Sequence, residues 1–175
     1  MKTKIKLVAI LIALLSVSFA FAQQDKSKRP SPPDSLQVTT TDGVTIRINY
    51  SKPSLKGRQI GTELVKYGEV WRTGANEITV LEVDKDVLVE GKALPKGKYG
   101  LWTIPTENET TLIFSKKWNG WGVGYKDVED QLRVKTNNEK SSNTVEQFTI
   151  TADASGKVNL NWGNLIIPIH IKAAK

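Results

Sequence analysis

Apolar and polar residues alternate along much of the chain with a period of two, which is typical of β-strands with one buried face. In residues 44–50, the apolar side chains of Val44, Ile46, Ile48 and Tyr50 would face one side of a sheet and the polar ones the other. Comparable segments follow at 78–83, 87–89, 99–104, 111–115, 131–136, 145–152, 157–161 and 165–172. The pattern therefore predicts roughly nine to ten strands separated by frequent turns.

Helix signals are few. Residues 62–67, closed by Gly68, could form one short helix, and residues 127–131 could form a single turn. We therefore predict an all-β fold, an antiparallel β-sandwich or jelly roll with one or two short helices. A closed barrel is the alternative architecture.

The first residues have the composition of an export signal. Three lysines precede an apolar run at 7–17, and Ala20-Phe21-Ala22 fits the small-x-small rule for signal peptidase. We predict a signal peptide at 1–22, a flexible polar leader at 23–34 and one domain at 35–175. The apolar run is shorter than the roughly 20 residues of a membrane span, so a retained anchor is the less favoured alternative.

The composition narrows the possible chemistry and the compartment. The chain has no cysteine, which rules out thiol catalysis and Cys-based metal sites and favours a bacterial periplasmic or extracellular location. His170 is the single histidine and cannot form a multi-His site, so we expect no metal and no cofactor. Without the three signal lysines the formal net charge falls from +7 to +4, and no basic run suggests nucleic-acid binding.

Two segments combine residue types that binding sites use. The stretch "EVWRTGANE" at 69–77 contains Trp71, Arg72, Asn76 and Glu77, and Gly74 gives it the character of a loop. The other lies at 116–127, where Trp118, Trp121 and Tyr125 alternate with glycines. Either segment could present polar and aromatic groups to a ligand, or could anchor a loop to the core. On the structural interpretation, we predict that Arg72 and Glu77 pair with each other or with a shared partner beside a mostly buried Trp71.

Four blocks of sequence resemble a known family. The strings "INYSKPSLKGRQIG", "LVKYGEVWRTGANE", "LPKGKYGLWTIP" and "WGVGYKDVEDQLRV" are similar, in this order, to exported bacterial proteins catalogued as domain of unknown function 2911. The resemblance runs from about residue 31 to residue 172 and implies a single exported β-rich domain, without an established activity or substrate. The positions that match its motifs are Tyr50, Pro53, Gly57, Arg58, Tyr67, Gly68, Trp71, Arg72, Gly74, Asn76, Glu77, Tyr99, Trp121, Gly122 and Tyr125.

These observations favour a binding or accessory protein over an enzyme. We expect a non-catalytic domain whose partner is a glycan, a peptide or another envelope component, and we expect no nucleic-acid partner and no membrane span after signal cleavage. The alternatives are a carboxylate-dependent hydrolase acting on polysaccharide and a purely structural envelope protein. The candidate binding residues are Arg58, Tyr67, Trp71, Arg72, Asn76, Glu77, Trp121 and Tyr125.

Overall fold

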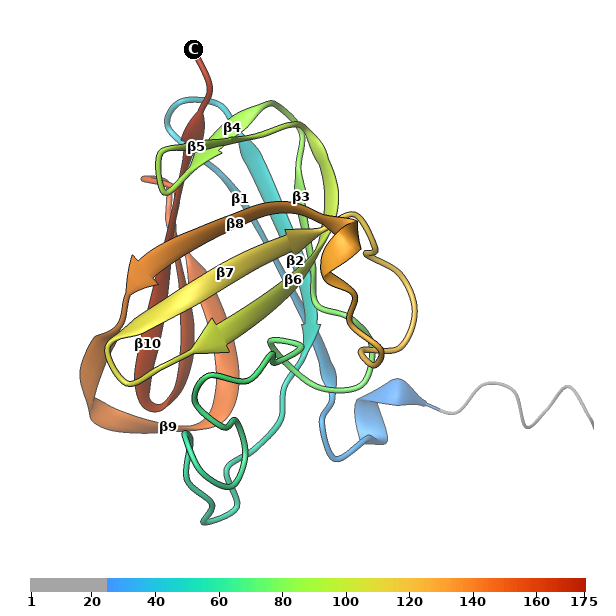
Figure 1. Ribbon diagram of the computed structural model, residues 1–175, viewed down its shortest axis with the longest axis vertical. Helices are drawn as coiled ribbons and strands as arrows, with labels where there is room; N and C mark the ends of the chain where they lie inside the picture. The colour runs from blue at the N-terminus through green and yellow to red at the C-terminus, as the bar shows by residue number, and fades with distance from the viewer. Residues whose placement is uncertain (1–24) are drawn as a thin grey trace, which may run out of the picture.

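The computed structural model describes residues 25–175 and consists of ten strands in two antiparallel sheets (Figure 1). The predicted signal peptide at 1–22 lies outside the described residues. The strands are β1 (Pro33–Thr39), β2 (Thr45–Ser51), β3 (Val80–Val83), β4 (Val87–Val89), β5 (Lys92–Leu94), β6 (Gly97–Pro105), β7 (Glu109–Ser115), β8 (Asp130–Asn137), β9 (Glu139–Ala152) and β10 (Lys157–Ala173). Two short 3-10 helices, η1 (Lys26–Lys28) and η2 (Asp127–Glu129), complete the described chain.

The two sheets enclose one main hydrophobic core. The larger sheet has the order β1-β2-β3-β6-β7-β8 and the smaller one the order β5-β4-β10-β9. Both edges of the larger sheet approach the smaller one, since β1 contacts β9 and β8 contacts β10. The alternation predicted for residues 44–50 is present, because Ile46 and Ile48 are fully buried while Asn49 is exposed. The prediction of an all-β sandwich is confirmed.

Strand boundaries differ from the predicted ones where local features outweigh the pattern. Residues 157–161 and 165–172 belong to one strand, β10, which continues through a bulge at Gly163. Gly163 has a φ of +58°, and this left-handed conformation allows the irregularity without a break in the strand. Two strands, β1 and β5, had no predicted counterpart, since β1 lies at a sheet edge with half-buried side chains and β5 has three residues.

The helix predicted at 62–67 does not form. Gly61 N–H donates to the Val65 carbonyl, and Gly61 forms a parallel bridge with Lys66, so the segment is a compact loop. A helix this short has too few hydrogen bonds to offset its nucleation cost. The loop also positions the Tyr67 ring against Gly61, where an added Cβ would lie 2.6 Å from a ring carbon. The predicted turn after residue 127 is present as η2.

Two long irregular connections reach the outer face of the larger sheet. One joins β2 to β3 at residues 52–79, and the other joins β7 to β8 at residues 116–129. In Figure 1, the green connection lies below the sheets and the orange one loops beside them. Within residues 25–175 the structure contains no helix of the length and apolarity that crossing a bilayer requires.

Candidate functional site

The two segments that stand out in the sequence lie side by side in the structure. Glu77 and Trp121 form an antiparallel bridge, the Gly122 N–H donates to the Asn76 carbonyl at 2.9 Å, and the Ile78 N–H donates to the Gly120 carbonyl at 3.1 Å. This pairing requires a glycine at 122, because a Cβ there would lie 2.8 Å from Arg72 Cδ and 3.1 Å from the Asn76 carbonyl oxygen. The two segments thus form one surface feature.

The 116–129 connection is fixed on the outer face of the larger sheet. At Gly100, an added Cβ would lie 2.3 Å from the Lys117 carbonyl oxygen, so the loop backbone rests directly on β6. Below the loop, Trp102 packs in a small apolar cluster and contacts the Tyr125 ring at a centroid distance of 5.2 Å. Tyr125 Oη donates to Asp130 Oδ2 at 2.6 Å and accepts from Arg133 at 2.6 Å. Tyr125 is therefore an anchor of the loop.

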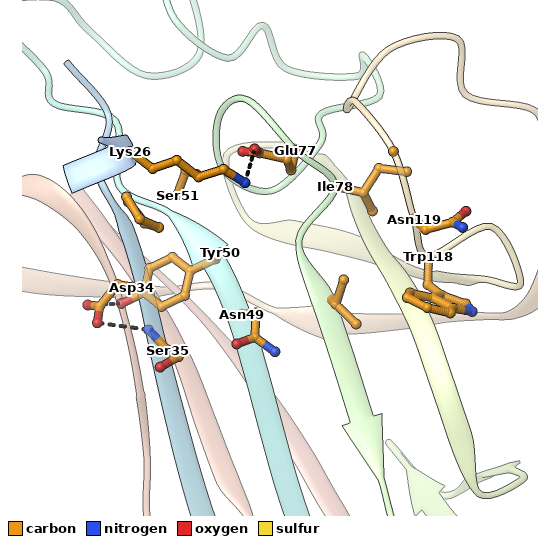
Figure 2. Close-up of a pocket in the computed structure, with 13 residues that line it drawn as sticks. Lys26, Asp34, Ser35, Asn49, Tyr50, Ser51, Glu77, Ile78, Trp118 and Asn119 are labelled. Carbon is orange, nitrogen blue, oxygen red and sulfur yellow. Dashed lines mark hydrogen bonds and ion pairs between the residues drawn. The ribbon is translucent and has the colours of Figure 1, made fainter. Parts of the chain in front are cut away.

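An open groove of about 570 Å³ runs along the outer face beside this loop. Ser35, Asn49 and Val80 are neighbours in register on β1, β2 and β3 and line its floor. Figure 2 shows Asn49 on β2 and the Trp118 indole on the far side of β3, with Asn119 next to it. Trp118 is 41% exposed, and Lys98 Nζ lies 5.4 Å from its ring centroid. The loop thus supplies an aromatic wall to a floor that contains both polar and apolar side chains.

The segment that precedes β1 lies at the other side of the groove. Although we predicted a flexible leader at 23–34, residues 25–32 make defined contacts, and β1 begins at Pro33. Arg29 Nη1 donates to both oxygens of Glu77, at 2.9 and 3.1 Å, and Lys26 Nζ lies 3.1 Å from Oε1 (Figure 2). The Asn76 side chain adds a hydrogen bond to the Ser31 carbonyl at 2.9 Å. Glu77 therefore connects the leader to the loop.

Electrostatics at Glu77 favour the ionised form. Partial burial raises the pKa of the carboxyl, but the hydrogen bonds from Arg29, from its own backbone N–H and from Lys26 outweigh burial and lower the pKa to about 2. The carboxylate is therefore charged at neutral pH and acts as an acceptor for the two cations of the leader.

A pH dependence of stability follows from the lowered pKa of Glu77. Its ionised form stabilises the fold above the unfolded value of 4.5, and this contribution is lost as the pH falls toward the folded value of about 2. We expect Glu77→Gln to reduce the free energy of unfolding at pH 7 by at most about 1 kcal/mol, because the side chain is 37% exposed. In urea unfolding at pH 7, 4.5 and 2.5, the difference between wild type and variant should shrink with falling pH.

Glu69→Gln is the matched control, since Glu69 forms an exposed pair with Lys66 at 3.9 Å. It should change the free energy of unfolding by much less than Glu77→Gln does at pH 7. A difference between wild type and Glu77→Gln that stays constant from pH 7 to pH 2.5 would contradict the role assigned to the carboxylate.

The predicted pair between Arg72 and Glu77 is wrong. Within residues 25–175, Arg72 forms no ion pair and no side-chain hydrogen bond, and its aliphatic part packs on Gly122. The reason is that the ends of the segment pair with different neighbours: Trp71 bridges Thr103 of β6, while Glu77 bridges Trp121. The two side chains thus have separate environments, and the carboxylate meets cations from a segment 48 residues earlier in the chain.

Trp71 belongs to the core and not to the groove. Its half-buried ring stacks on Trp162 at 5.5 Å between centroids and meets the edge of Phe148 at 5.2 Å. Asn76 has a left-handed φ of +60°, and its side chain bonds the leader. These residues shape the segment that ends at Glu77, and of the four candidates in it Glu77 alone lines the groove.

The remaining candidates lie at other places. Trp121 is 52% exposed, with the Arg29 guanidinium 5.8 Å from its ring centroid, and together with Tyr125 it borders a smaller cavity of about 210 Å³. Arg58 and Tyr67 line a separate cavity near the β9–β10 hairpin. The site prediction missed Ser35, Asn49, Trp118 and Asn119. Trp118 stood in the aromatic–glycine segment, and Asn49 was an outward polar position of a predicted strand, so both left a signal in the sequence.

Comparison with known proteins gives a family without a biochemical assignment. No curated protein and no solved structure matches the chain. A family model described as protein of unknown function (DUF2911) matches residues 31–171, which include all but the leader side of the groove. The match confirms the resemblance in the four sequence blocks, and the chain therefore belongs to the DUF2911 family.

Proposed function

We propose that the protein is a non-catalytic binding domain that holds a glycan in the groove on the outer face of the larger sheet. The observation that carries the proposal is that the Trp118 indole and the polar side chains of Ser35 and Asn49 line the same groove. Ser35, Asn49 and Asn119 are exposed, and none of their side chains forms a hydrogen bond with another group in residues 25–175. These groups are therefore available to a ligand.

The chemistry of this surface suits a sugar. A pyranose has C–H faces that pack on a flat aromatic ring, and its hydroxyls both donate and accept hydrogen bonds, as amide and hydroxyl side chains do. A peptide bound by strand addition would need a free strand edge, whereas the floor of the groove is the side-chain surface of a sheet. The geometry therefore favours the glycan among the partners expected from the sequence.

The carboxylates of the groove support a binding role over a hydrolytic one. Burial raises the pKa of Asp34, but hydrogen bonds from the Ser35 backbone, Lys52 and Tyr50 lower it overall. The pKa of Glu77 is lowered as well. A glycosidase needs a carboxylic acid with a raised pKa as proton donor, and neither group meets this requirement.

Trp118→Ala tests the proposal. Native affinity electrophoresis would compare wild type and variant in gels that contain soluble β-glucan, xylan or peptidoglycan fragments. We expect wild type to be retarded by at least one of them and Trp118→Ala to bind about tenfold more weakly or worse, because an aromatic contact surface dominates such a site.

Trp121→Ala is the matched control, since Trp121 lies on the same connection and is somewhat more exposed than Trp118, but lies outside the groove. It should retain binding. Equal losses in the two variants would place the ligand elsewhere on the loop, and retardation of wild type by none of the polysaccharides would favour a purely structural role.

We further propose that the protein acts outside the cytoplasm, in the periplasm or beyond the cell. The predicted signal at 1–22 supports this location, which would give the groove access to envelope or environmental glycans. Mass spectrometry of the protein isolated from its native cells should find a mature chain that begins at Gln23, and an intact chain from Met1 would contradict export.

A further inference from the structure

We propose that the cavity between the 52–79 connection and the β9–β10 hairpin is a second binding site, which takes a carboxylate carried on a small apolar body. The cavity measures about 510 Å³, a size that small-molecule sites typically have. It shares no lining residue with the groove on the outer face, so this proposal stands independently of glycan binding. The connection that borders it is the green segment below the sheets in Figure 1.

The anion-binding group is the Arg58 guanidinium. Its Nε donates to the Leu55 carbonyl at 3.0 Å and its Nη2 donates to the Ser54 carbonyl at 3.2 Å. These two bonds hold the planar group in place at the cavity wall, while Nη1 forms no hydrogen bond with any group in residues 25–175. A guanidinium that is fixed before binding loses little entropy when it pairs with a carboxylate.

The floor of the cavity is apolar. Leu55 is buried, and Ile60 and Leu165 are half-buried beside it. Gly163, at the bulge of β10, also lines the cavity, and a Cβ there would lie 3.4 Å from Ile60 Cδ1. The Tyr67 ring, 41% exposed, forms part of the wall. A ligand body of carbon atoms would thus replace water over an apolar surface.

Two further charges border the cavity. Lys140 Nζ lies 3.5 Å from Glu107 Oε1, and both side chains are largely exposed. Together with Arg58 they leave the cavity with one excess positive charge, which favours an anion. The single fixed guanidinium and the apolar floor suit a carboxylate with a hydrophobic body better than inorganic phosphate, which would leave the floor uncovered.

The ligand chemistry has two natural sources, a fatty acid and the C-terminus of a peptide. Nuclear magnetic resonance titrations of the full mature chain would use octanoate for the first and N-acetylleucine for the second. The neutral counterparts octanamide and N-acetylleucinamide have the same bodies without the charge, and inorganic phosphate has the charge without the body.

We expect saturable shifts of the backbone amides at 55–67 and 163–165 with at least one carboxylate. The corresponding neutral amide should bind at least tenfold more weakly, since it lacks the charge-assisted hydrogen bond. The carboxylate that binds better identifies the source. Equal affinity for acid and amide, a stronger response to phosphate, shifts confined to other regions, or no saturation with either carboxylate up to about 10 mM would overturn the proposal.

Substitutions test whether the Arg58 guanidinium is responsible for carboxylate binding. Arg58→Gln should weaken carboxylate binding at least tenfold. Arg47→Gln, which removes an arginine of β2 that donates to Gln37 of β1, should leave carboxylate binding unchanged. Glu107→Gln, at an exposed position, should strengthen binding by up to about fivefold because it removes the competing negative charge. This gain can be measured even if Arg58→Gln disturbs the fold around residue 58. Unchanged or weaker carboxylate binding by Glu107→Gln would contradict a role for the positive charge of the cavity.

Discussion

Gly100→Ala should destabilise the protein by about 3 kcal/mol and remove the aromatic wall of the groove. The added methyl would lie 2.3 Å from the Lys117 carbonyl oxygen and 2.9 Å from Ile78 Cγ2, both of which are held in place. Backbone atoms cannot move aside as a flexible side chain can, so the 116–129 connection must lift from β6. Urea unfolding would measure the loss of stability, and affinity electrophoresis would measure the loss of glycan retardation.

Gly57→Ala separates this steric effect from the general cost of replacing a glycine. Nothing lies within 4 Å of a Cβ at Gly57, so only its left-handed φ of +75° opposes the substitution. We expect a smaller loss of stability and unchanged glycan retardation. Gly100→Ala with wild-type stability and retardation would show that the connection does not depend on contact with β6.

Trp71→Ala should lower the free energy of unfolding by about 3 kcal/mol, the lower end of the range for loss of a large aromatic side chain from a core, because the ring is half-buried. Its ring contacts both Trp162 and Phe148, which also contact each other, and packs against the main core cluster between the two sheets. Thermal and urea unfolding would measure the loss. At a temperature where the variant is folded, glycan binding should persist, because the ring does not line the groove.

Trp121→Ala again provides the comparison. This side chain is half-exposed and makes a cation–π contact with the Arg29 guanidinium, so its removal should cost less than about 1 kcal/mol. Similar losses for the two variants would contradict the assignment of Trp71 to the core. If fully folded Trp71→Ala lost glycan retardation, the segment at 69–77 would have a direct role in glycan binding.

The sequence predicts those parts of the fold that depend on local alternation. Ile46 and Ile48 on β2 are buried as the period of two requires, because burial of one face decides both the strand and its orientation. The helix predicted at 62–67 does not form, because its sequence pattern is short and weak. The close packing of the Tyr67 ring on Gly61, which favours the loop, is visible only in the folded structure. Edge strand β1 has no fully buried face and consequently little pattern.

The sequence predicted several residues of the candidate site but not the contacts between them. Both loop segments were recognised from residue type, yet their mutual pairing and the role of Arg29 depend on residues far apart in the chain. The sequence indicated Glu77 as an ion-pair acceptor, but the predicted partner was Arg72 of the same loop and not Arg29. The sequence marked Asn49 only as an outward polar position on a strand, and it became a site candidate when the register placed it between Ser35 and Val80.

The leader that contacts Glu77 has a practical consequence for any fusion to this domain. Lys26 lines the groove, so a protein or tag joined directly before residue 25 would begin at the mouth of the proposed glycan site. The chain ends at the opposite end of the fold, above β4 and β5 in Figure 1. Immobilisation through Lys175 would therefore leave the groove facing the solution, whereas immobilisation through the N-terminus would direct it toward the support.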